Sequence, residues 1–258
     1  MTSPDPKLRL TIDGPIATLL FDRPDKLNAV DETMLDELIL QCRRIERDST
    51  IRVVIVTGSG EKAFSAGGDI AAWSALEAND FARFWVRHGH AAFDALARLR
   101  QPVIAVLNGH ALGGGLELAA LADLRIAEAH IKLGQPESGL GIIAGWSGTQ
   151  RAVRRFGAQA VRRMALFGEV FTASDAATLG IVDHVTAKGN GMALARQLAD
   201  KVIQRAPLAT ELTKMLINAA EGEERERVLE ALAGAAAASS PELQEGLAAF
   251  REKRQPRF

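Results

Sequence analysis

Short, continuous apolar runs recur along the first two thirds of the chain. They are rich in Val, Ile and Leu, they end at Gly, Pro or Asp residues, and they occupy 16–21, 51–57, 103–107 and 124–129, with 181–185 as a further candidate. Runs of this length and composition are typical of strands that are buried on both faces. The apolar pattern therefore predicts at least four core strands.

Helical periodicity fills the segments between these runs. The first such segment has one apolar stripe with charged residues opposite: Leu35, Leu38, Cys42 and Ile45. Asp31 is placed to cap the start of this helix, and a second helix is predicted over 92–101, closed by Pro102. Strands that alternate with helices indicate an α/β architecture with mostly parallel pairing.

After about residue 190 the pattern becomes helical. Four segments suit helices, 192–207, 208–220, 224–240 and 241–254, and Pro241 is well placed in a first turn. The Ala-rich stretch 231–238 could be taken for a linker, but alanine is the best helix former and a packed helix is the better interpretation. We therefore expect an α/β core over 1–190 and a helical region over 191–258.

Composition excludes several classes of protein. The chain has 258 residues with 31 Lys and Arg against 32 Asp and Glu, so its formal charge of -1 gives no electrostatic basis for binding nucleic acid or a membrane surface. Cys42 is the sole cysteine, which rules out an internal disulfide and fits a reducing compartment. The first residues lack the apolar core of a secretory signal, and no apolar run has membrane-spanning length. We expect a cytoplasmic protein.

The stretch NGHALGGGLEL, 108–118, places three glycines between a predicted strand and a predicted helix. Such glycines can expose backbone N–H groups to a ligand oxygen at a helix N-terminus, or they can simply permit close packing, and this segment alone leaves the two explanations equally open. The chain lacks the G-x-x-x-x-G-K-[ST] of a P-loop and the G-x-G-x-x-G of a dinucleotide site, so neither nucleotide site is indicated.

A second glycine element, EKAFSAGGDI at 61–70, also follows a predicted strand. Taken alone it is better explained as a surface turn capped by Asp69. Two such elements after two core strands could direct two backbone N–H groups at one oxygen, which is the requirement for an oxyanion hole.

Two carboxylates accompany the glycines. Glu117 lies in the first turn of a predicted helix, where the helix dipole favours an acid, and Glu137 follows Pro136, where it could merely begin another helix. Each one alone is better explained as structural. If both face the same pocket, their proximity keeps one of them protonated more easily, and a neutral acid beside an ionised base is what the addition of water to a double bond requires.

Other candidate chemistry is weaker. GWSGT, 145–149, resembles the nucleophile elbow G-x-S-x-G but has Thr149 in place of the last glycine, which argues against a serine hydrolase. The five histidines include no H-E-x-x-H, and His88 and His90 would not share a helix face. The sequence therefore predicts no metal site.

Five motifs occur in a characteristic order: FDRPDKLNAVD, EKAFSAGGDI, NGHALGGGLELAALAD, KLGQPESGLGIIAGWSGTQR and SPELQEGLAAFREKRQPRF. Over nearly its whole length the chain resembles the crotonase superfamily of enoyl-CoA hydratases and isomerases. The resemblance implies an α/β spiral of ββα units, with a C-terminal helical region that serves oligomerisation and covers the active site. It also implies a homotrimer, or a hexamer built as a dimer of trimers, and an acyl-CoA thioester substrate, so that coenzyme A belongs to the substrate and no separate cofactor is expected.

The resemblance also assigns roles to individual residues. The oxyanion donors fall on the N–H groups of Gly68 and Gly114, and the catalytic acids fall on Glu117 and Glu137. Family members that carry both acids tend to be hydratases, so hydration of a 2-enoyl-CoA is the preferred reaction. An isomerase, thioester hydrolase or C–C lyase is the alternative, and a non-catalytic acyl-CoA-binding protein is a weaker one. The expected contacts to substrate or coenzyme A are Lys26, Ala66, Gly67, Asp69, Ile70 and Trp146, with Lys253 as a candidate from a neighbouring subunit.

The chain departs from the family pattern near the expected acyl pocket. Ala144 and Trp146 stand in a loop where relatives often have Pro and small residues, and Trp73 and Trp85 are expected close by. These departures leave the reaction class unchanged, but they put an ordinary fatty acyl chain in doubt as the substrate.

Overall fold

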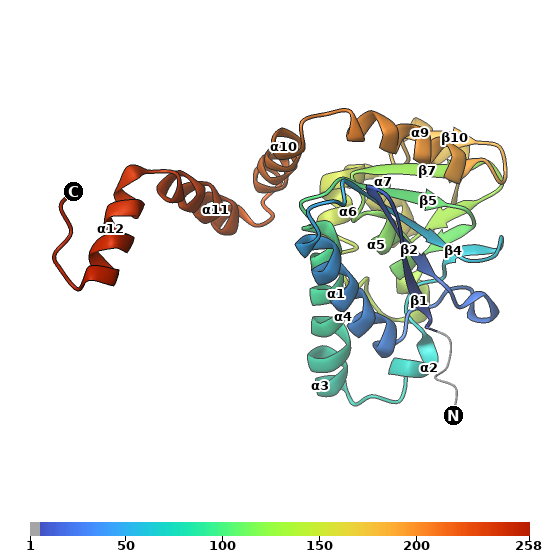
Figure 1. Cartoon of the computed structure of the whole chain (residues 1–258). Coiled ribbons are helices and arrows are strands. Elements are labelled where there is room, and N and C mark those ends of the chain that lie inside the picture. Colours follow the sequence, from blue (N-terminus) through green and yellow to red (C-terminus); the bar gives the residue numbers. More distant parts are fainter. Residues whose placement is uncertain (1–5) are drawn as a thin grey trace, which may run out of the picture. The chain divides into compact units, whose positions relative to one another are not determined.

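The computed structural model describes residues 6–258, apart from the side chain of residue 226 (Figure 1). Its strands are β1 (Leu8–Asp13), β2 (Ile16–Phe21), β3 (Val53–Gly58), β4 (Ala63–Ser65), β5 (Val103–Leu107), β6 (His110–Leu112), β7 (Leu124–Glu128), β8 (Lys132–Gly134), β9 (Phe171–Thr172) and β10 (His184–Thr186). The longer helices are α1 (Glu32–Arg47), α4 (Arg87–Ala97), α7 (Ala158–Phe167), α9 (Gly191–Ile203), α10 (Pro207–Ala220), α11 (Arg225–Ala238) and α12 (Pro241–Glu252). Short helical segments are η1 (Pro24–Lys26), α2 (Ile70–Trp73), α3 (Ala78–Asp80), the π-helix η2 (Phe81–Val86), α5 (Gly114–Ala119), η3 (Glu137–Leu140), α6 (Gln150–Phe156) and α8 (Ala173–Thr178).

The chain divides into a first unit that ends at Glu211 and a second unit, Leu212–Phe258. The second unit holds most of α10 together with α11 and α12. The roles predicted for the C-terminal region, in oligomerisation and in covering the site, stay predictions.

The first unit contains two sheets. The larger has the order β1-β2-β3-β5-β7-β10, in which only the β1–β2 pair is antiparallel. The smaller has the order β4-β6-β8-β9, with β4, β6 and β8 parallel and β9 antiparallel to β8. The strand pairs β3–β4, β5–β6 and β7–β8 each supply one strand to each sheet before a helical segment follows. The predicted α/β spiral of ββα units is therefore confirmed.

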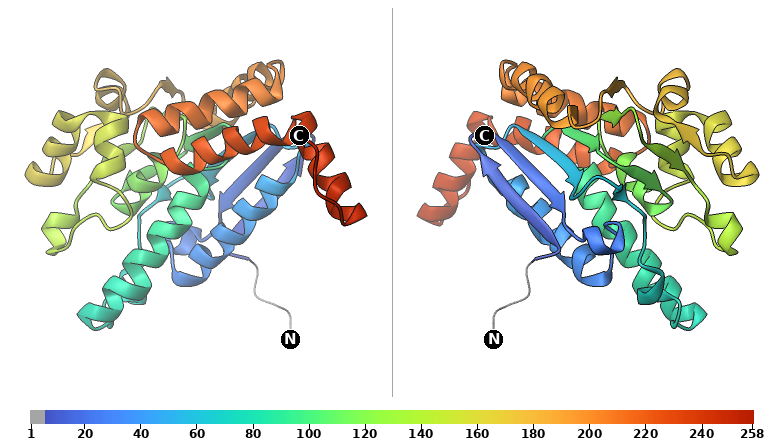
Figure 2. Two further views of the ribbon diagram at one scale, coloured as in Figure 1. Left: turned by 90° about the vertical axis from the view of Figure 1, so that its left-hand side faces the viewer. Right: turned by 90° about the vertical axis from the view of Figure 1, so that its right-hand side faces the viewer.

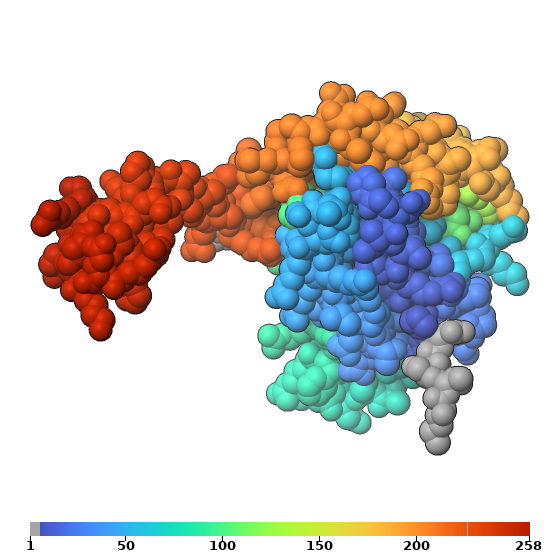
Figure 3. Space-filling model, viewed as in Figure 1, coloured from blue at the N-terminus to red at the C-terminus, as the bar shows by residue number. Residues whose placement is uncertain are grey.

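The centre of the larger sheet is buried on both faces, because every position of β3 and of β5 is buried. Along β3, Val54 and Val56 belong to the main core, whereas Val53 and Ile55 belong to a second cluster on the opposite face, where α9 packs. This is the alternation that a strand of period two imposes. Helices α1 and α4 lie side by side in contact, as Figure 2 shows, and the surfaces of α1 (blue) and of the α3–α4 segment (teal) adjoin in Figure 3.

Most predicted elements are confirmed, some with shifted ends. Asp31 caps α1 by accepting from the Met34 N–H at 3.1 Å, and the bounds predicted for β2 and β5 agree with the structure. The run 51–57 becomes a strand only from Val53, and the run 181–185 becomes one only from His184.

The helix predicted over 92–101 was wrong at both ends, since α4 spans Arg87–Ala97 and the chain leaves it at Arg98. Proline restricts the residue before it to extended backbone, so the helix ends well ahead of Pro102 and the chain enters β5 at Val103. The sequence analysis also missed β1, an edge strand with one fully buried residue, and the short strands of the smaller sheet. No helix in the described part of the chain combines the length and apolar character needed to cross a bilayer.

Candidate active site

The three glycines after β6 have different structural roles. Gly113 has φ +53°, a conformation that side chains rarely adopt, and its N–H donates to the Gly134 carbonyl at 2.9 Å. Gly114 is the first residue of α5, where a backbone N–H has no partner within the helix. A Cβ on Gly115 would lie 1.9 Å from the Ser65 carbonyl oxygen, so only glycine allows α5 to approach β4.

The second glycine element lies directly against the first. Gly67 has φ +96°, and a Cβ on it would lie 2.7 Å from the Gly114 nitrogen. Its carbonyl accepts from the Val30 N–H at 2.8 Å, and the Asp69 N–H donates to the Val30 carbonyl, so this bridge does not use the Gly68 N–H. A Cβ on Gly114 would lie 3.2 Å from the Gly68 nitrogen. The two backbone N–H groups predicted as oxyanion donors are therefore neighbours in space.

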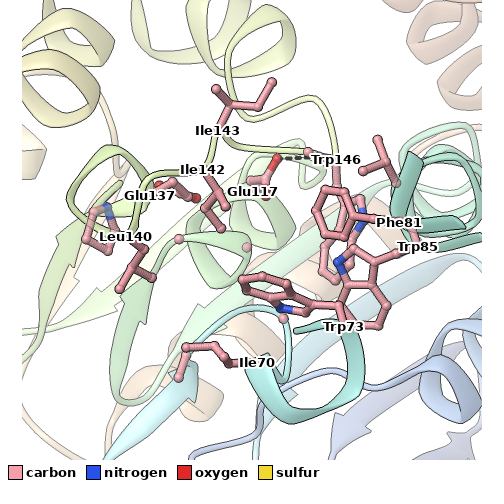
Figure 4. Close-up of a pocket in the computed structure, with 17 residues that line it drawn as sticks. Ile70, Trp73, Phe81, Trp85, Glu117, Glu137, Leu140, Ile142, Ile143 and Trp146 are labelled. Carbon is pink, nitrogen blue, oxygen red and sulfur yellow. Dashed lines mark hydrogen bonds between the residues drawn. The ribbon is translucent and has the colours of Figure 1, made fainter. Parts of the chain in front are cut away.

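Both glycines line one cavity of about 100 Å³ in the first unit, shown in Figure 4. Its other lining residues are Ala66, Ile70, Trp73, Phe81, Trp85, Val86, Gly113, Glu117, Pro136, Glu137, Leu140, Ile142, Ile143, Gly145 and Trp146. Aromatic side chains gather on one side of it and Glu137 and Leu140 lie on the other. Glu117 and Glu137 are the charged residues among those that line it.

The Glu117 carboxyl group is buried, and two backbone hydrogen bonds fix its position. Its Oε1 accepts from the backbone N–H groups of Trp146 and Gly148, both at 2.7 Å. Burial, and to a smaller extent the nearby Glu137 carboxylate, together raise the pKa of Glu117 to about 7, although the two N–H donors oppose the shift. Because both donors occupy Oε1, a proton on this carboxyl group belongs on Oε2.

Glu137 is only 8% exposed and begins η3, which follows β8 through Gln135 and Pro136. Burial raises its pKa above the ordinary value. Among the described residues its Oε1 has no hydrogen-bond partner, and it lies 3.2 Å from the position that a Cβ on Gly113 would take. A buried carboxyl oxygen without a partner is costly in a folded protein, so Glu137 is available to a ligand in this cavity.

The remaining predicted contact residues divide into two groups. Ala66, Ile70 and Trp146 line the cavity. Asp69 instead caps α2 through the Ala71 N–H at 3.0 Å and pairs with Arg23 at 2.7 Å. Gly67 shapes the backbone beside the cavity and is not among its lining residues.

Lys26 lies away from this cavity, in the exposed segment η1. Its neighbour Leu27 lines a second cavity of about 430 Å³, together with Glu61, Lys62, Ala63, Ala66, His110 and Leu112. Ala66 lines both cavities, so the two adjoin at that residue. Lys253 lies in the second unit, at the end of α12, and its proposed contact stays a prediction.

The loop 145–148 contains the predicted contact residue Trp146 and also Gly148, a site residue that the sequence analysis missed. A Cβ on Gly148 would lie 2.6 Å from both Cγ and Oε1 of Glu117, and the Gly148 carbonyl accepts from Gln135 Nε2 at 2.5 Å. In the sequence Gly148 stands out only as part of the imperfect nucleophile motif GWSGT. Because it is 31 residues from Glu117, no local sequence pattern predicts that the two residues are in contact.

Ser147, at the centre of that motif, has φ +75°. Its Oγ lies 3.2 Å from His90 Nδ1 and 3.3 Å from His90 Nε2, and His90 Nε2 lies 3.7 Å from Asp94. An oxygen that is equidistant from both ring nitrogens is not aligned with the lone pair of either, so the geometry does not form the proton relay of a serine hydrolase. In the described part of the chain no group of three or more His, Cys, Asp or Glu side chains is arranged to hold a metal ion.

Two neighbouring glycines and two buried carboxyl groups therefore line one cavity whose other side chains are apolar, and comparison with known proteins identifies the family. The enoyl-CoA hydratase/isomerase family model matches residues 11–258, and the chain belongs to this family.

Individual relatives agree with this assignment. A crotonyl-CoA hydratase of Syntrophomonas wolfei is 35% identical over 248 residues, 94% of each chain. A short-chain-enoyl-CoA hydratase of Clostridium acetobutylicum is 38% identical over 206 residues, covering 80% of this chain and 78% of the relative. The crystal structure of an enoyl-CoA hydratase from Bacillus anthracis superposes with a TM-score of 0.81 at 31% identity, over 98% of this chain and 99% of the other.

Proposed function

We propose that the protein is an enoyl-CoA hydratase, which adds water across the 2,3 double bond of an enoyl-CoA thioester to give a 3-hydroxyacyl-CoA. The observation that carries the proposal is the shared cavity, in which two buried glutamates with raised pKa values face two adjacent glycines. The names of the relatives support the same reaction.

The thioester carbonyl would accept hydrogen bonds from the N–H groups of Gly68 and Gly114. Negative charge develops on this oxygen when water attacks C3, and fixed backbone donors stabilise that charge without reorganisation. One such donor contributes about 3 kcal/mol to transition-state stabilisation in comparable sites. The helix α5 begins at Gly114, so its N-terminal dipole acts in the same direction.

Glu117 would act as the base and Glu137 as the acid. The two N–H donors on Oε1 of Glu117 leave its Oε2 to orient the water and to take its proton as the new C3–O bond forms. The electron pair of the double bond moves through C2 toward the thioester oxygen, and Glu137 then delivers a proton to C2. The two carboxyls titrate as a coupled pair, so a single proton shared between them resets the site.

The coenzyme A portion would occupy the second cavity, which meets the first at Ala66. Lys62 lines that cavity, and Lys26 precedes Leu27, another of its lining residues, so both lysines are candidates to contact the phosphates. Assembly as a homotrimer or hexamer and a cytoplasmic location are proposed with the function.

Hydration of crotonyl-CoA, followed through the loss of the conjugated thioester absorbance, tests the proposal. We expect Glu117→Gln and Glu137→Gln each to lower kcat by roughly 10²–10⁴-fold, the usual contribution of acid–base catalysis. Glu77→Gln is the control, because Glu77 is exposed and lies outside the lining set. Absence of hydration across a panel of linear, branched and cyclic enoyl-CoAs would refute the proposal. Survival of double-bond isomerisation in Glu117→Gln with its loss in Glu137→Gln would instead identify an isomerase.

A further inference from the structure

The three tryptophans of the chain, Trp73, Trp85 and Trp146, all line the cavity that holds the two glutamates. We propose that these indoles close the acyl side of the site, so that the enzyme accepts short, uncharged acyl groups of about four carbons and excludes medium and long fatty acyl chains. The inference rests on the proposed function, which it makes more specific.

The indoles reach the glycine that would bind the thioester oxygen. A Cβ on Gly68 would lie 2.9 Å from Cζ2 of Trp85, 3.3 Å from Cη2 of Trp146 and 3.6 Å from Nε1 of Trp73. A Cβ on Gly114 would likewise lie 3.2 Å from Cζ3 of Trp146. An acyl chain that starts at the carbonyl between these glycines therefore meets an aromatic wall within a few bonds.

Two of the three indoles, those of Trp85 and Trp146, belong to the hydrophobic core, and Trp73 packs against it. Trp146 is 3% exposed, and its Nε1 donates to the Trp85 carbonyl in the π-helix η2 at 3.3 Å. Its ring packs in tilted arrangements against Phe93 and Trp85, with centroids 4.9 and 5.1 Å apart. A Cβ on Gly89 would lie 2.0 Å from Trp146 Nε1, so α4 accommodates the indole only because residue 89 is glycine.

The direction of the acyl chain decides how much of it the site can hold. The cavity is open beside Leu140 and Ile143, which are 58% and 82% exposed, so its volume alone sets no limit on the acyl group. On the opposite side the indoles close it. An acyl chain that runs from the glycines toward the indoles has room for only a few carbons, and a fatty acyl chain of eight or more carbons does not fit there.

The chemical character of the lining excludes a charged acyl group. Apart from the two glutamates, the side chains that line the cavity are aliphatic or aromatic, including Ile70, Ile142 and Ile143. A terminal carboxylate would meet these glutamates and would find no cation among the lining residues to balance it. The pocket therefore fits an uncharged hydrocarbon acyl group.

Two measurements on the purified full-length protein test this inference. The first is kcat/KM for 2-enoyl-CoAs of four, six, eight and ten carbons, which we expect to fall at least tenfold from four to eight carbons. The second is binding of butyryl-, octanoyl- and glutaryl-CoA by calorimetry, in which butyryl-CoA should bind at least tenfold more tightly than the others. Equal turnover or equal binding of the eight-carbon compounds would overturn the inference.

The binding measurement separates this inference from the proposed function. Selective binding of butyryl-CoA without hydration of any substrate would refute the hydratase and leave the size limit standing. Hydration of long substrates in preference to crotonyl-CoA would support the hydratase and refute the size limit.

Removal of one indole tests whether the tryptophans cause the limit on acyl-chain length. Trp73 is only partly buried, so we expect Trp73→Ala to fold and to raise the eight- to four-carbon ratio of kcat/KM by about tenfold. Phe84→Ala is the matched control, because Phe84 is 57% exposed, lies in the neighbouring η2 and does not line the cavity. An unchanged ratio in Trp73→Ala, with circular dichroism matching the unaltered protein, would count against the indole wall as the determinant.

Discussion

At the scale of single residues, Glu117 is the most informative side chain of the molecule. It is 4% exposed, yet it carries an ionisable group with two fixed N–H donors on one oxygen. Burial dominates the balance and brings its pKa to about 7, where a carboxyl group can exchange protons at neutral pH. The two N–H donors fix the orientation of the carboxyl group, and burial raises its pKa toward neutral pH.

Ionisation of Glu117 should make stability depend on pH. A carboxyl whose pKa is raised from 4.5 to about 7 by folding costs nothing below pH 4.5, destabilises increasingly between pH 4.5 and 7, and reaches its full cost above that range. The full cost is about 3 kcal/mol. Relative to the unaltered protein, we expect Glu117→Gln to gain a free energy of unfolding of this order between pH 4.5 and pH 8, measured by urea denaturation. A constant difference across this range would show that the carboxyl does not titrate as described.

Catalysis should depend on the same ionisation. Because Glu117 acts as a base, we expect kcat/KM for crotonyl-CoA to fall as the pH drops below about 7, approaching tenfold per pH unit. The residual activity of Glu117→Gln should lack this acid limb. An acid limb that persists unchanged in the variant would assign the titration to another group.

At the scale of elements, the loop 145–148 joins the two halves of the site. Its backbone presents two N–H groups to Glu117, and the left-handed conformation of Ser147 lies between those two donors. The Gly148 carbonyl is tied to Gln135 in the segment that leads to Glu137. The loop therefore couples the positions of both carboxyls.

Substitution of Gly148 tests whether the loop positions the Glu117 carboxyl group for catalysis. In Gly148→Ala the new Cβ would lie 2.6 Å from Glu117, so we expect the carboxyl to shift and kcat to fall on the order of 10²-fold, as misplacement of about 1 Å does. The control is Gly139→Ala in η3, where a Cβ meets nothing within 4 Å. The measurement is kcat for crotonyl-CoA hydration by both variants, and Gly139→Ala should keep the kcat of the unaltered protein. Full activity in Gly148→Ala would contradict the role given to the loop.

At the scale of the whole molecule, the second unit exposes apolar side chains on one helix. Leu243, Leu247 and Phe250 of α12 recur at intervals of four and three residues, which places them on one helix face, and they are 39%, 40% and 83% exposed. Such a stripe is typical of a surface that contacts a partner. It supports the proposed self-association, without fixing the number of subunits.

A charge on this stripe should weaken assembly. We expect Leu247→Glu to lower the mass measured by analytical ultracentrifugation, because a carboxylate at an apolar interface loses its hydration. Gln244→Glu adds the same charge at an exposed polar position of α12 and should leave the mass unchanged. If the unaltered protein is a monomer, or if both variants behave alike, the stripe does not mediate assembly.

The sequence by itself determined the core of this fold. Apolar runs rich in Val, Ile and Leu predict the strands β2, β3, β5 and β7, because burial removes their apolar side chains from water. The apolar stripe from Leu35 to Ile45 predicts α1 for the same reason. The ordered glycine motifs identified the family and nominated Gly68, Gly114, Glu117 and Glu137. These signals are local, and each can be interpreted within ten to twenty residues.

Only the tertiary structure decided how these residues meet. Three features of the site depend on contacts between segments far apart in the chain. Glu117 and Glu137 share a cavity, Gly148 lies against Glu117, and three indoles surround Gly68. Side-chain periodicity records which face of an element is buried, but it does not record the partner on the other side. The short strands of the smaller sheet escaped prediction for the same reason, since pairing with their neighbours and not their own composition holds them extended.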